Sequence, residues 1–537
     1  MLKLLIHCCL FFMATTALSQ VELKESHLPI LIIDTEDQTI VDEPKITANF
    51  KVINKGNDAI NFIDDTDFEY DGIIGIELRG QTSQQLFPKK GYGFETRNED
   101  GSNNNVKLLG LPKENDWVLH GPFSDKSLIR NALTFTMANQ FMSYAPRVRF
   151  CELVINDEYR GVYLLVEKIK IDKNRVNIAK LDETDIAGEK RTGGYMLKFD
   201  KKGPGDRFWV SKYKPIPNSY QNTEFIQLFP KANDIKPEQQ NYIRDFISEF
   251  EDALMGDDYL DPTRGYKKFI DEDSFIDLIL INEVTKNLDA YRISTYMYKD
   301  RDSIDSRLKM GPAWDYNLAF GNANFCRGER SDNWALDFNS ICPEDNWVNH
   351  VWWKRLLSDT TFTNKLEQRW FSLRETTFSL INWNNTIDSL VTHIGDAGDR
   401  NFQRWPVIGS WVWPNNFVGQ TYLSEVNYLK NWVNDRLLWI DENIKNLSTF
   451  QEFNIFKSLV YPNPSASNVC FKIPQAWSSS STKLTVFDAL GRMVLNQSFG
   501  EDQQVLSIDF QEPGYYHYII TKSDVQILDK DKFIISK

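Results

Sequence analysis

Apolar and polar residues alternate along much of the first two hundred positions. The segments LPILIID, ITANFKVIN, IIGIELRG and YGFETRN, all between Leu28 and Asn98, carry this period of two and are separated by turn-forming residues. The pattern continues in VRFCELVIN and VYLLVEKIK, which flank a DEYRG turn within Arg147 to Lys170 and predict a β-hairpin. Thr192 to Asp200, TGGYMLKFD, predicts a further strand. We therefore expect a β-rich N-terminal part that ends near residue 200.

A helical period takes over in the middle of the chain. An apolar stripe at four-residue spacing predicts a helix from Asp125 to about Met142, and similar stripes predict helices at Pro237 to Met255 and Asp273 to Lys286. Residues 330 to 447 contain eleven tryptophans, and because several fall at helical spacing we interpret most of them as core. Trp405 to Asn415, WPVIGSWVWPN, is the one segment that we interpret as a surface loop. Exposed tryptophans there could bind sugars by stacking.

The stretch from Asn287 to Asn322, NLDAYRISTYMYKDRDSIDSRLKMGPAWDYNLAFGN, predicts a single β-hairpin. Ser294 to Lys299 alternates as a strand, a charged segment makes the turn, and Leu308 to Gly311 returns. Because a hairpin brings its two ends together, Asp289 before it and Asp315 after it can face one pocket. One carboxylate could then accept the proton of an attacking hydroxyl while the other binds a divalent metal, as phosphoryl transfer requires. Turn-forming aspartates at strand ends are the alternative interpretation.

A second candidate site lies in Ile76 to Glu95, IELRGQTSQQLFPKKGYGFE. Its small polar turn and return strand carry Arg79, Gly80, Ser83, Lys89 and Lys90. Backbone N–H groups and cations in such a turn could hold phosphates. A solvated hairpin tip is the alternative.

Composition limits the class of protein. The chain has 537 residues, enough for two or three domains, and its 42% hydrophobic and 25% charged residues are typical of globular proteins. The balance of 61 basic against 75 acidic residues gives a net charge of −14, which argues against a nucleic acid as partner.

The N-terminus and the cysteines indicate export. Residues 1–19 combine Lys3, a short apolar run and small residues before Gln20, which predicts a secretory signal peptide. No later stretch is long and apolar enough to predict a transmembrane segment. In an oxidising compartment, Cys326 and Cys342 suit a disulfide, with a zinc pair as the alternative. Cys151, in an apolar strand, is expected to be a free core thiol.

The sequence PAWDYNLAFGN, with NLDAYRISTY before it, resembles the signature of CotH-like proteins, named for spore coat protein H, an atypical protein kinase. The resemblance spans about Leu28 to Ile444 and implies a two-lobed kinase-like fold with ATP and Mg²⁺ or Mn²⁺ as cofactors. It places Asp289 at the catalytic-loop aspartate and Asp315 at the metal-binding one. The family tends to have Asn where this chain has Ser294, and its WDxD pattern has Asp where this chain has Asn317. Both substitutes offer an oxygen, but Asn317 lowers the charge of the metal site.

The same resemblance implies the nucleotide contacts. The RGxxS turn matches the family's RGxSS, and the lysine pair that follows makes Lys90 the candidate for the lysine on the phosphates. The pattern DKxxxRN assigns Arg130 to a phosphate or a pocket carboxylate, with a surface ion pair as the alternative. Glu167 would lie beside the base or ribose, and Lys198 is a reserve phosphate contact. The full candidate set for the nucleotide is Arg79, Gly80, Ser83, Lys90, Arg130, Glu167 and Lys198.

After Asn446 the composition shifts to short alternating strands, which predict a small β-sandwich of about seven strands or fewer. YPNP, TVFDALGRMV, PGYYHYII and the closing KFIISK resemble the C-terminal sorting domain of the type IX secretion pathway of Bacteroidetes. The resemblance implies that the protein uses the type IX secretion machinery to cross the outer membrane and is then released or anchored at the surface.

The expected fold class is α+β, with an atypical protein-kinase-like two-lobed domain followed by a small immunoglobulin-like sandwich. We expect a signal peptide at 1–19, a CotH kinase-like domain at 20–447, a linker at 448–457 and a sorting domain at 458–537. Two functions fit this organisation. The first is a secreted kinase that transfers the ATP γ-phosphoryl group to Ser or Thr of an exported or surface protein. The second is a binding protein with a kinase-like fold that attaches to a surface protein or polysaccharide.

Overall fold

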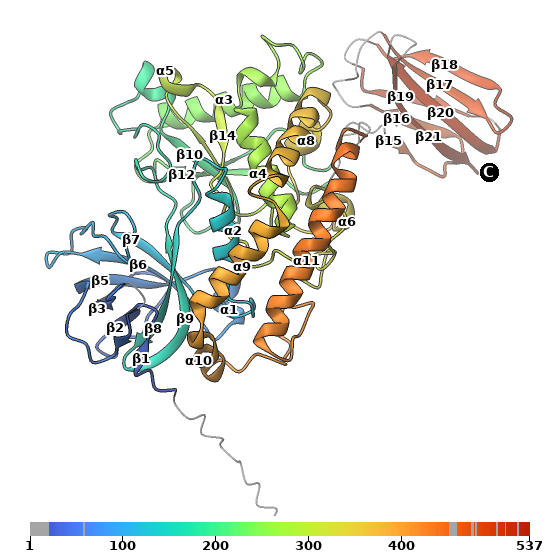
Figure 1. The fold of residues 1–537 in the computed structure, drawn as a ribbon. Coiled ribbons are helices and arrows are strands. Elements are labelled where there is room, and N and C mark those ends of the chain that lie inside the picture. Colours follow the sequence, from blue (N-terminus) through green and yellow to red (C-terminus); the bar gives the residue numbers. More distant parts are fainter. Residues whose placement is uncertain are drawn as a thin grey trace, which may run out of the picture. The chain divides into compact units, whose positions relative to one another are not determined.

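The computed structural model describes residues 21–449, apart from 57, 58 and 218, and residues 459–536 apart from 474–476, 478–480, 501–502, 511 and 523–525. The predicted signal peptide and residues 450–457 of the predicted linker lie outside the described residues. The chain divides into two compact units, and Met1–Lys126, Val148–Lys168 and Leu390–Ser410 make up the first. The second contains Ser127–Arg147, Ile169–Ser389 and Trp411–Lys537. Helices and strands contribute to both (Figure 1).

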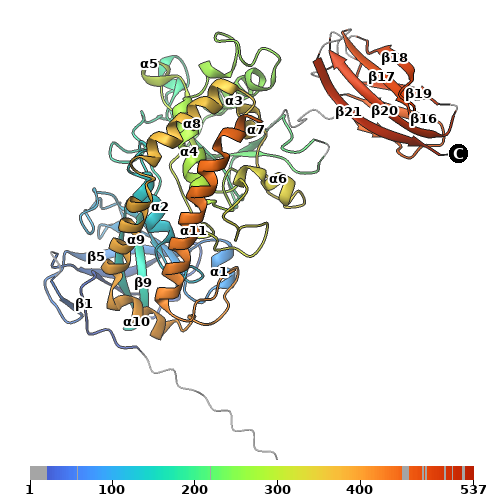
Figure 2. The ribbon, with the colours of Figure 1, turned by 45° about the vertical axis from the view of Figure 1, so that its right-hand side comes forward.

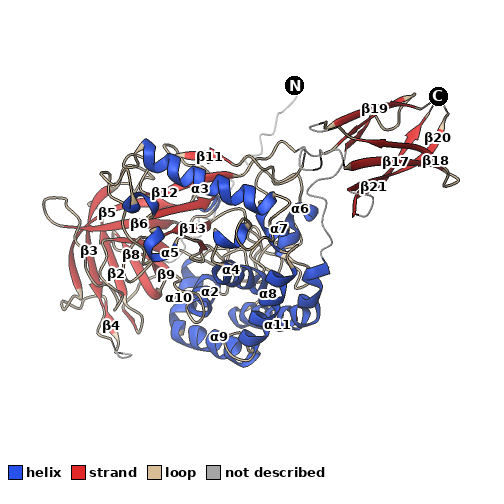
Figure 3. Ribbon diagram, turned by 90° about the horizontal axis from the view of Figure 1, so that it is seen from above, coloured by secondary structure: helices blue, strands red, loops and turns tan. Residues whose placement is uncertain are grey.

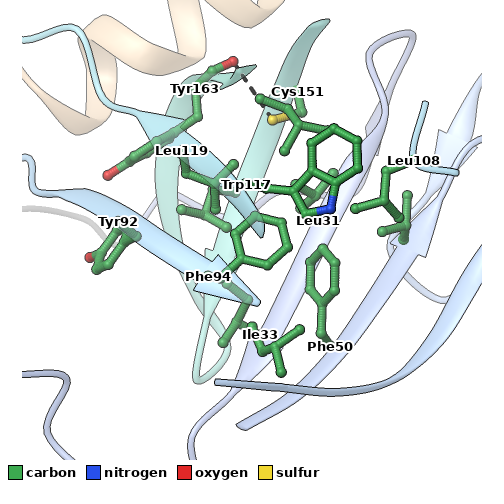
Figure 4. Close-up of a cluster of buried hydrophobic side chains, with 14 of the residues drawn as sticks. Leu31, Ile33, Phe50, Tyr92, Phe94, Leu108, Trp117, Leu119, Cys151 and Tyr163 are labelled. Carbon is green, nitrogen blue, oxygen red and sulfur yellow. Dashed lines mark hydrogen bonds between the residues drawn. The ribbon is translucent and has the colours of Figure 1, made fainter. Parts of the chain in front are cut away.

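The first unit is built around a closed β-barrel, in the strand order β2-β3-β5-β6-β7-β9-β8. Its strands are β2 (Ile30–Asp34), β3 (Ile46–Ile53), β5 (Tyr70–Arg79), β6 (Gly91–Arg97), β7 (Asp116–His120), β8 (Val148–Ile155) and β9 (Glu158–Glu167). Every neighbouring pair is antiparallel except β2 with β8, whose parallel pairing closes the barrel. The period of two therefore turns alternate side chains inward. Figure 4 shows Phe50, Phe94, Trp117 and Cys151 in the resulting core.

Helix α10 (Asp396–Arg404) packs on strand β9 through buried polar contacts. Lys89 Nζ donates to the Val162 carbonyl at 2.6 Å and to Asn401 Oδ1 at 2.7 Å. Arg400 Nη2 pairs with the buried Glu152 carboxylate at 2.5 Å. Burial lowers the pKa of Lys89 well below its ordinary value. Lys89 therefore joins a helix to the barrel. The smaller elements of this unit are α1 (Thr82–Leu86) and the strand pair β1 (Glu25–Ser26) and β4 (Asn61–Phe62).

His120, the last residue of β7, makes the stability of the first unit sensitive to acid. Burial lowers its pKa from 6.5 to about 4, with Asp125 raising it and Lys89 lowering it by smaller amounts. Between these values the unfolded chain binds a proton that the folded chain does not, so stability is lost as the pH falls from 6.5 towards 4. We expect a loss of about 2 kcal/mol between pH 7 and pH 5.

This loss can be measured as the fall in the thermal midpoint between pH 7 and pH 5 for the wild type and for His120→Gln. The variant should lack this component, whereas His517→Gln, at an exposed position, should keep it. Equal acid sensitivity of the wild type and His120→Gln would contradict the assignment.

A five-stranded antiparallel sheet, in the order β11-β12-β10-β13-β14, lies in the second unit. The strands are β10 (Tyr195–Phe199), β11 (Phe208–Val210), β12 (Glu224–Phe229), β13 (Thr295–Lys299) and β14 (Leu308–Met310). The predicted hairpin is confirmed, because Met297 pairs with Met310 and Lys299 with Leu308. The short helix α5 (Asp302–Asp305) forms within its turn.

Helices make up most of the remainder, and Figures 2 and 3 show the longest of them, α11, beside α4 and α8. The helices are α2 (Arg130–Ala138), α3 (Pro237–Met255), α4 (Glu272–Thr285), α6 (Phe338–Ile341), α7 (Trp352–Leu356), α8 (Thr360–Arg374), α9 (Leu380–Ile394) and α11 (Tyr422–Asn443). The 3₁₀ segments are η1 (Glu189–Thr192), η2 (Tyr266–Lys268), η3 (Ala335–Asp337) and η4 (Ile444–Thr449). Leu390, one of the points at which the chain passes from one unit to the other, lies within α9.

The helix predicted from Asp125 to Met142 is shorter than expected. It begins at Arg130 because Leu128 adopts a left-handed backbone with φ of 64°, which does not belong to a right-handed helix. It ends at Ala138, where the Asn139 side chain donates to the Phe135 carbonyl at 2.9 Å. Such local side-chain hydrogen bonds compete with helix continuation.

The cysteine and tryptophan predictions are confirmed within the described chain. Cys326 and Cys342 form a disulfide, and Cys151 is a buried free thiol whose pKa burial raises. Most of the tryptophans between 330 and 447 are buried. Trp411 and Trp413 are 58% and 36% exposed and lie in the segment predicted to be a surface loop, and Trp347 is 37% exposed.

Residues 459–536 form two antiparallel sheets with a core of their own. One sheet has the order β15-β16-β19 and the other β18-β17-β20-β21. The strands are β15 (Leu459–Tyr461), β16 (Asn468–Lys472), β17 (Thr482–Asp488), β18 (Met493–Ser498), β19 (Val505–Asp509), β20 (Gly514–Lys522) and β21 (Gln526–Ile535). Phe471 from the first sheet packs on Tyr518 and Phe533 from the second. The predicted small β-sandwich is therefore present.

Candidate functional site

The two acidic segments at the ends of the β13–β14 hairpin lie together in the second unit. Asn287 joins them, because its Nδ2 donates to the Asp315 carbonyl at 3.1 Å and its Oδ1 accepts from the Asp289 N–H at 3.3 Å. Leu288 and Leu318 pack in one hydrophobic cluster beneath these segments. Residues 26 positions apart in the sequence are thus fixed as one site by a side-chain amide and a shared core.

The Asp289 carboxylate is oriented by Arg292. Arg292 Nη2 donates to Asp289 Oδ1 at 2.9 Å, and the carboxylate is 20% exposed while the arginine is 3% exposed. Arg292 is itself held by the Trp347 carbonyl at 3.1 Å and by Asp345 Oδ1 at 3.4 Å. Within the described residues, Oδ2 of Asp289 makes no hydrogen bond to the protein. Arg292 therefore fixes one oxygen of a carboxylate that is partly exposed.

The loop that carries Asp315 and Asn317 is held by polar groups from helices α2 and α4 and by Asn322, which follows it in the chain. Its Tyr316 N–H donates to Asn131 Oδ1 at 2.6 Å, and the Tyr316 hydroxyl donates to Asn282 Oδ1 at 2.7 Å. Asn322 Nδ2 donates to the Asn317 carbonyl at 2.8 Å. These contacts determine the backbone path of the loop.

Arg130 contributes to the same loop. The side chain is 1% exposed, and its Nε donates to the Ala319 carbonyl at 3.1 Å. Its Nη1 donates to Ser127 Oγ at 3.1 Å. These bonds let Arg130 support the loop that follows Asp315.

The backbone around the site is strained. Among the described residues, non-glycine positions with positive φ include Lys286 at 43°, Tyr291 at 70°, Ser294 at 49°, Asp315 at 63° and Phe320 at 54°. A residue with a bulky side chain, such as Tyr291, rarely adopts this left-handed backbone conformation. Such conformations cost about 1–3 kcal/mol each and cluster at functional sites. The concentration of strain between Lys286 and Phe320 therefore supports a functional role for this segment.

A buried ionic cluster fixes the chain beside the site. Arg436 Nη2 pairs with Glu283 Oε2 at 3.0 Å, and both side chains are at most 2% exposed. Burial raises the pKa of Glu283, while Arg436 opposes that shift. Lys286 donates to the carbonyls of Arg327, Arg330 and Asp332 at 2.7–3.0 Å. Burial, reinforced by the nearby Arg436, lowers the pKa of Lys286 to about 7.

The predicted nucleotide contacts of the first unit lie around the β5–β6 turn. Gly80 has φ of 107°, and a Cβ there would lie 2.2 Å from Ser83 Oγ, so the turn requires glycine. Lys90 Nζ donates to the carbonyls of Gln84 and Phe87 at 2.5 and 2.7 Å, which stabilises the same turn. Arg79 is the last residue of β5 and pairs with Gly91. The turn therefore holds Arg79, Gly80, Ser83 and Lys90 close together.

The remaining two candidates are placed on different strands. Glu167 is the last residue of β9 in the first unit and is fully buried opposite Trp117. Lys198 lies on β10 of the second unit, opposite Tyr296 of β13, and its Nζ pairs with Asp200 Oδ2 at 3.0 Å. Lys198 is thus on the strand next to β13, which follows the Asp289 segment.

A metal ion would find few protein donors here. Among the described residues no group of three or more His, Cys, Asp and Glu side chains is placed to hold a metal. Mg²⁺ is usually bound by one or two carboxylates together with substrate phosphates. Asp315 and Asn317 carry a carboxylate and an amide oxygen, which are donor types that such a metal binds.

Four residues that hold this site in place were not among the residues predicted from the sequence. Asn287 could have been suspected because it stands two residues before Asp289, whereas Asn131 and Arg436 come from distant helices. Arg292 could have been identified as the i+3 partner of Asp289.

The comparisons with known proteins define the class of protein and then its family. Residues 459–536 match the secretion system C-terminal sorting domain, so this is a protein secreted to the cell surface or outside by the type IX machinery. None of the helices in the described part of the chain is long and apolar enough to cross a membrane. Residues 76–440 match the CotH kinase protein family, and because this match covers more than half of the sequence, the chain belongs to that family.

Other comparisons add little. A search of curated proteins finds no match. Among solved structures, the twitchin kinase region from C. elegans is 10% identical, with 96% of this chain and 99% of that chain covered and a TM-score of 0.16. A likeness this low carries no argument about fold or function.

Proposed function

We propose that this protein is a secreted atypical protein kinase that transfers the γ-phosphoryl group of ATP to a Ser or Thr hydroxyl of an exported or surface protein. In this reaction the acceptor oxygen forms a bond to the γ-phosphorus, the bond from that phosphorus to the bridging oxygen breaks, and ADP leaves. The acceptor proton passes to a protein carboxylate. Membership of the CotH kinase family supports the reaction class.

The single observation that carries this proposal is the side-chain bridge of Asn287. Asn287 holds the Asp289 and Asp315 segments side by side. Its Oδ1 lies 3.3 Å from the Asp289 backbone nitrogen, and its Nδ2 lies 3.1 Å from the Asp315 carbonyl oxygen. Two aspartates on adjoining segments can then perform separate roles, one with the proton and one with the metal.

Asp289 is assigned as the general base. Arg292 fixes Oδ1, so Oδ2 is the atom proposed to receive the hydroxyl proton. The 20% exposure of the carboxylate allows an acceptor side chain to approach. Because Trp347 and Asp345 hold Arg292 from its other side, the carboxylate is oriented before the substrate arrives.

Asp315 and Asn317 are assigned to Mg²⁺ or Mn²⁺, which would neutralise charge on the phosphates when bound. Asn131, Asn322 and Arg130 hold the backbone of this loop, so the two donor side chains are carried on a fixed segment. We further assign Arg79, Gly80, Ser83 and Lys90 to the phosphates, and Lys90 also stabilises their turn. Lys198 and Glu167 stay candidates for the phosphates and for the base or ribose.

Thermal unfolding of the full chain with ATP and either metal tests the nucleotide site. A ligand at one hundred times its dissociation constant adds about 2.7 kcal/mol, which raises the midpoint by several degrees. Asp315→Ala should abolish the metal-dependent rise, whereas Asp396→Ala, in the first turn of α10, should retain it. No rise with ATP and either metal would contradict the proposal.

A binding protein without phosphoryl transfer is the second candidate, and one observation favours it. Trp411 is 58% exposed, and Trp413 is 36% exposed and stacks on Phe325 with the ring planes at 14°. Flat exposed rings of this kind can stack on sugars. Retention by an insoluble polysaccharide, lost in Trp411→Ala, together with no response to ATP, would identify this function.

A further inference from the structure

A groove beside α3 is separate from the residues assigned to phosphoryl transfer. Its cavity volume is about 650 Å³, within the range of ligand pockets. We call it the α3 groove. It is lined by Arg191, Glu238, Asn241, Tyr242, Asp245, Phe246, Glu249, Lys268, Phe269, Asp302 and Ser306. All of these residues belong to the second unit.

The α3 wall of the groove is acidic. Glu238, Asp245 and Glu249 lie on one side of the helix and are exposed. Asp245 pairs only weakly with Arg244, at 3.4 Å between two exposed side chains. The remaining carboxylate of the groove, that of Asp302, pairs with the buried Lys299 at 2.5 Å. Three carboxylates on the α3 wall are therefore available to an incoming positive charge.

The floor of the groove consists of aromatic rings that already attract cations. Lys299 lies 4.9 Å from the ring centre of Phe246 and 5.6 Å from that of Tyr242. The exposed Lys268 lies 4.6 Å from the ring centre of Phe269. Arg191, which also lines the groove, lies 5.5 Å from the ring centre of Tyr242. Aromatic faces bind ammonium and guanidinium groups by about 0.5–2 kcal/mol each.

We propose that the α3 groove binds a lysine- or arginine-bearing peptide segment of a protein partner. The carboxylates of Glu238, Asp245 and Glu249 pair with its charges, while its methylene chains lie on Phe246 and Tyr242, which are partly exposed. The open shape along α3 suits an extended segment, whose alternate side chains point into the groove. The groove would bind this segment whether or not Asp289 transfers a phosphoryl group.

Binding of a fluorescein-labelled peptide of alternating lysine and glycine to the full chain tests the assignment. Asp245→Asn combined with Glu249→Gln should weaken binding about tenfold, since each exposed ion pair contributes up to about 1 kcal/mol. Glu375→Gln, at an exposed position after α8, is the matched control and should bind as the wild type does. Asp289→Asn should also bind normally, which separates this site from phosphoryl transfer.

Three results would overturn the proposal. They are absence of binding, equal binding of the matched peptide of alternating glutamate and glycine, and equal weakening in Glu375→Gln. A photoreactive derivative of the lysine peptide should label residues 237–255, and labelling elsewhere would place the peptide at another site. Displacement of the peptide by a neutral hexasaccharide would instead identify the groove as a glycan site.

Discussion

Asp289→Asn should reduce phosphoryl transfer to a Ser-containing protein acceptor by a factor of about 10²–10⁴, the usual contribution of a general base. The variant keeps the size of the side chain and an oxygen for Arg292, so the site should stay folded. ATP and metal should still raise its thermal midpoint, because Asp315 and Asn317 are unchanged. The measurement is incorporation of radiolabelled phosphate with saturating ATP.

Asp345→Asn is the matched control for this variant. Asp345 is the other carboxylate on Arg292, at 3.4 Å, and it is not assigned to the reacting atoms. Its loss should reduce the rate by much less than the loss of Asp289. If the two variants lose the same activity, Asp289 acts only through Arg292 and is not the base.

Glu283→Ala should destabilise the second unit by about 3–5 kcal/mol, because it leaves the Arg436 guanidinium buried without its carboxylate. Glu283 also accepts from Tyr291, Ala335 and Leu336 at 2.9–3.0 Å, and these donors would lose their partner. The thermal midpoint of the unit should fall by about 10 °C.

A more exposed ion pair between α4 and α8 supplies the comparison for Glu283. Lys365 pairs with Glu272 at 2.5 Å, but the lysine is 49% exposed, so Lys365→Ala should cost less than about 1 kcal/mol. The double variant Glu283→Leu with Arg436→Met should recover part of the lost stability, since no unpaired charge is then buried. A small effect of Glu283→Ala would show that the cluster is not needed to hold the chain beside Asp289.

The local pattern of the sequence predicts the individual strands well but not their assembly. The hairpin between Thr295 and Met310 follows from alternation and a charged turn, and α3 has the predicted bounds, Pro237 to Met255. The barrel closes through β2 and β8, which are more than one hundred residues apart and pair in parallel. No short-range period in a sequence carries that information.

For the candidate site, too, the sequence predicts the local segments but not the contacts between distant ones. Asp289 and Asp315 could be brought together by reasoning from the hairpin alone. Asn131 ends the DKxxxRN pattern, but its contact with Tyr316 depends on how its helix packs. The contributions of Asn282 and Arg436 also depend on helices packed from elsewhere, and spacing in the sequence gives no sign of them. The helix at Arg130 begins five residues late because Leu128 is left-handed, a property that an apolar stripe does not reveal.

Strand β13 connects the two sites proposed for the second unit. Thr295, at one end, follows the Asp289 segment, and Lys299, at the other, lies beneath the rings of the α3 groove. Five residues of strand separate these ends by about 13 Å, which an extended peptide covers with about four residues. A partner held by a basic side chain in the groove would therefore need a spacing of this order before the hydroxyl that it offers to Asp289. The length of one strand would then decide which serines or threonines of a basic segment are accepted.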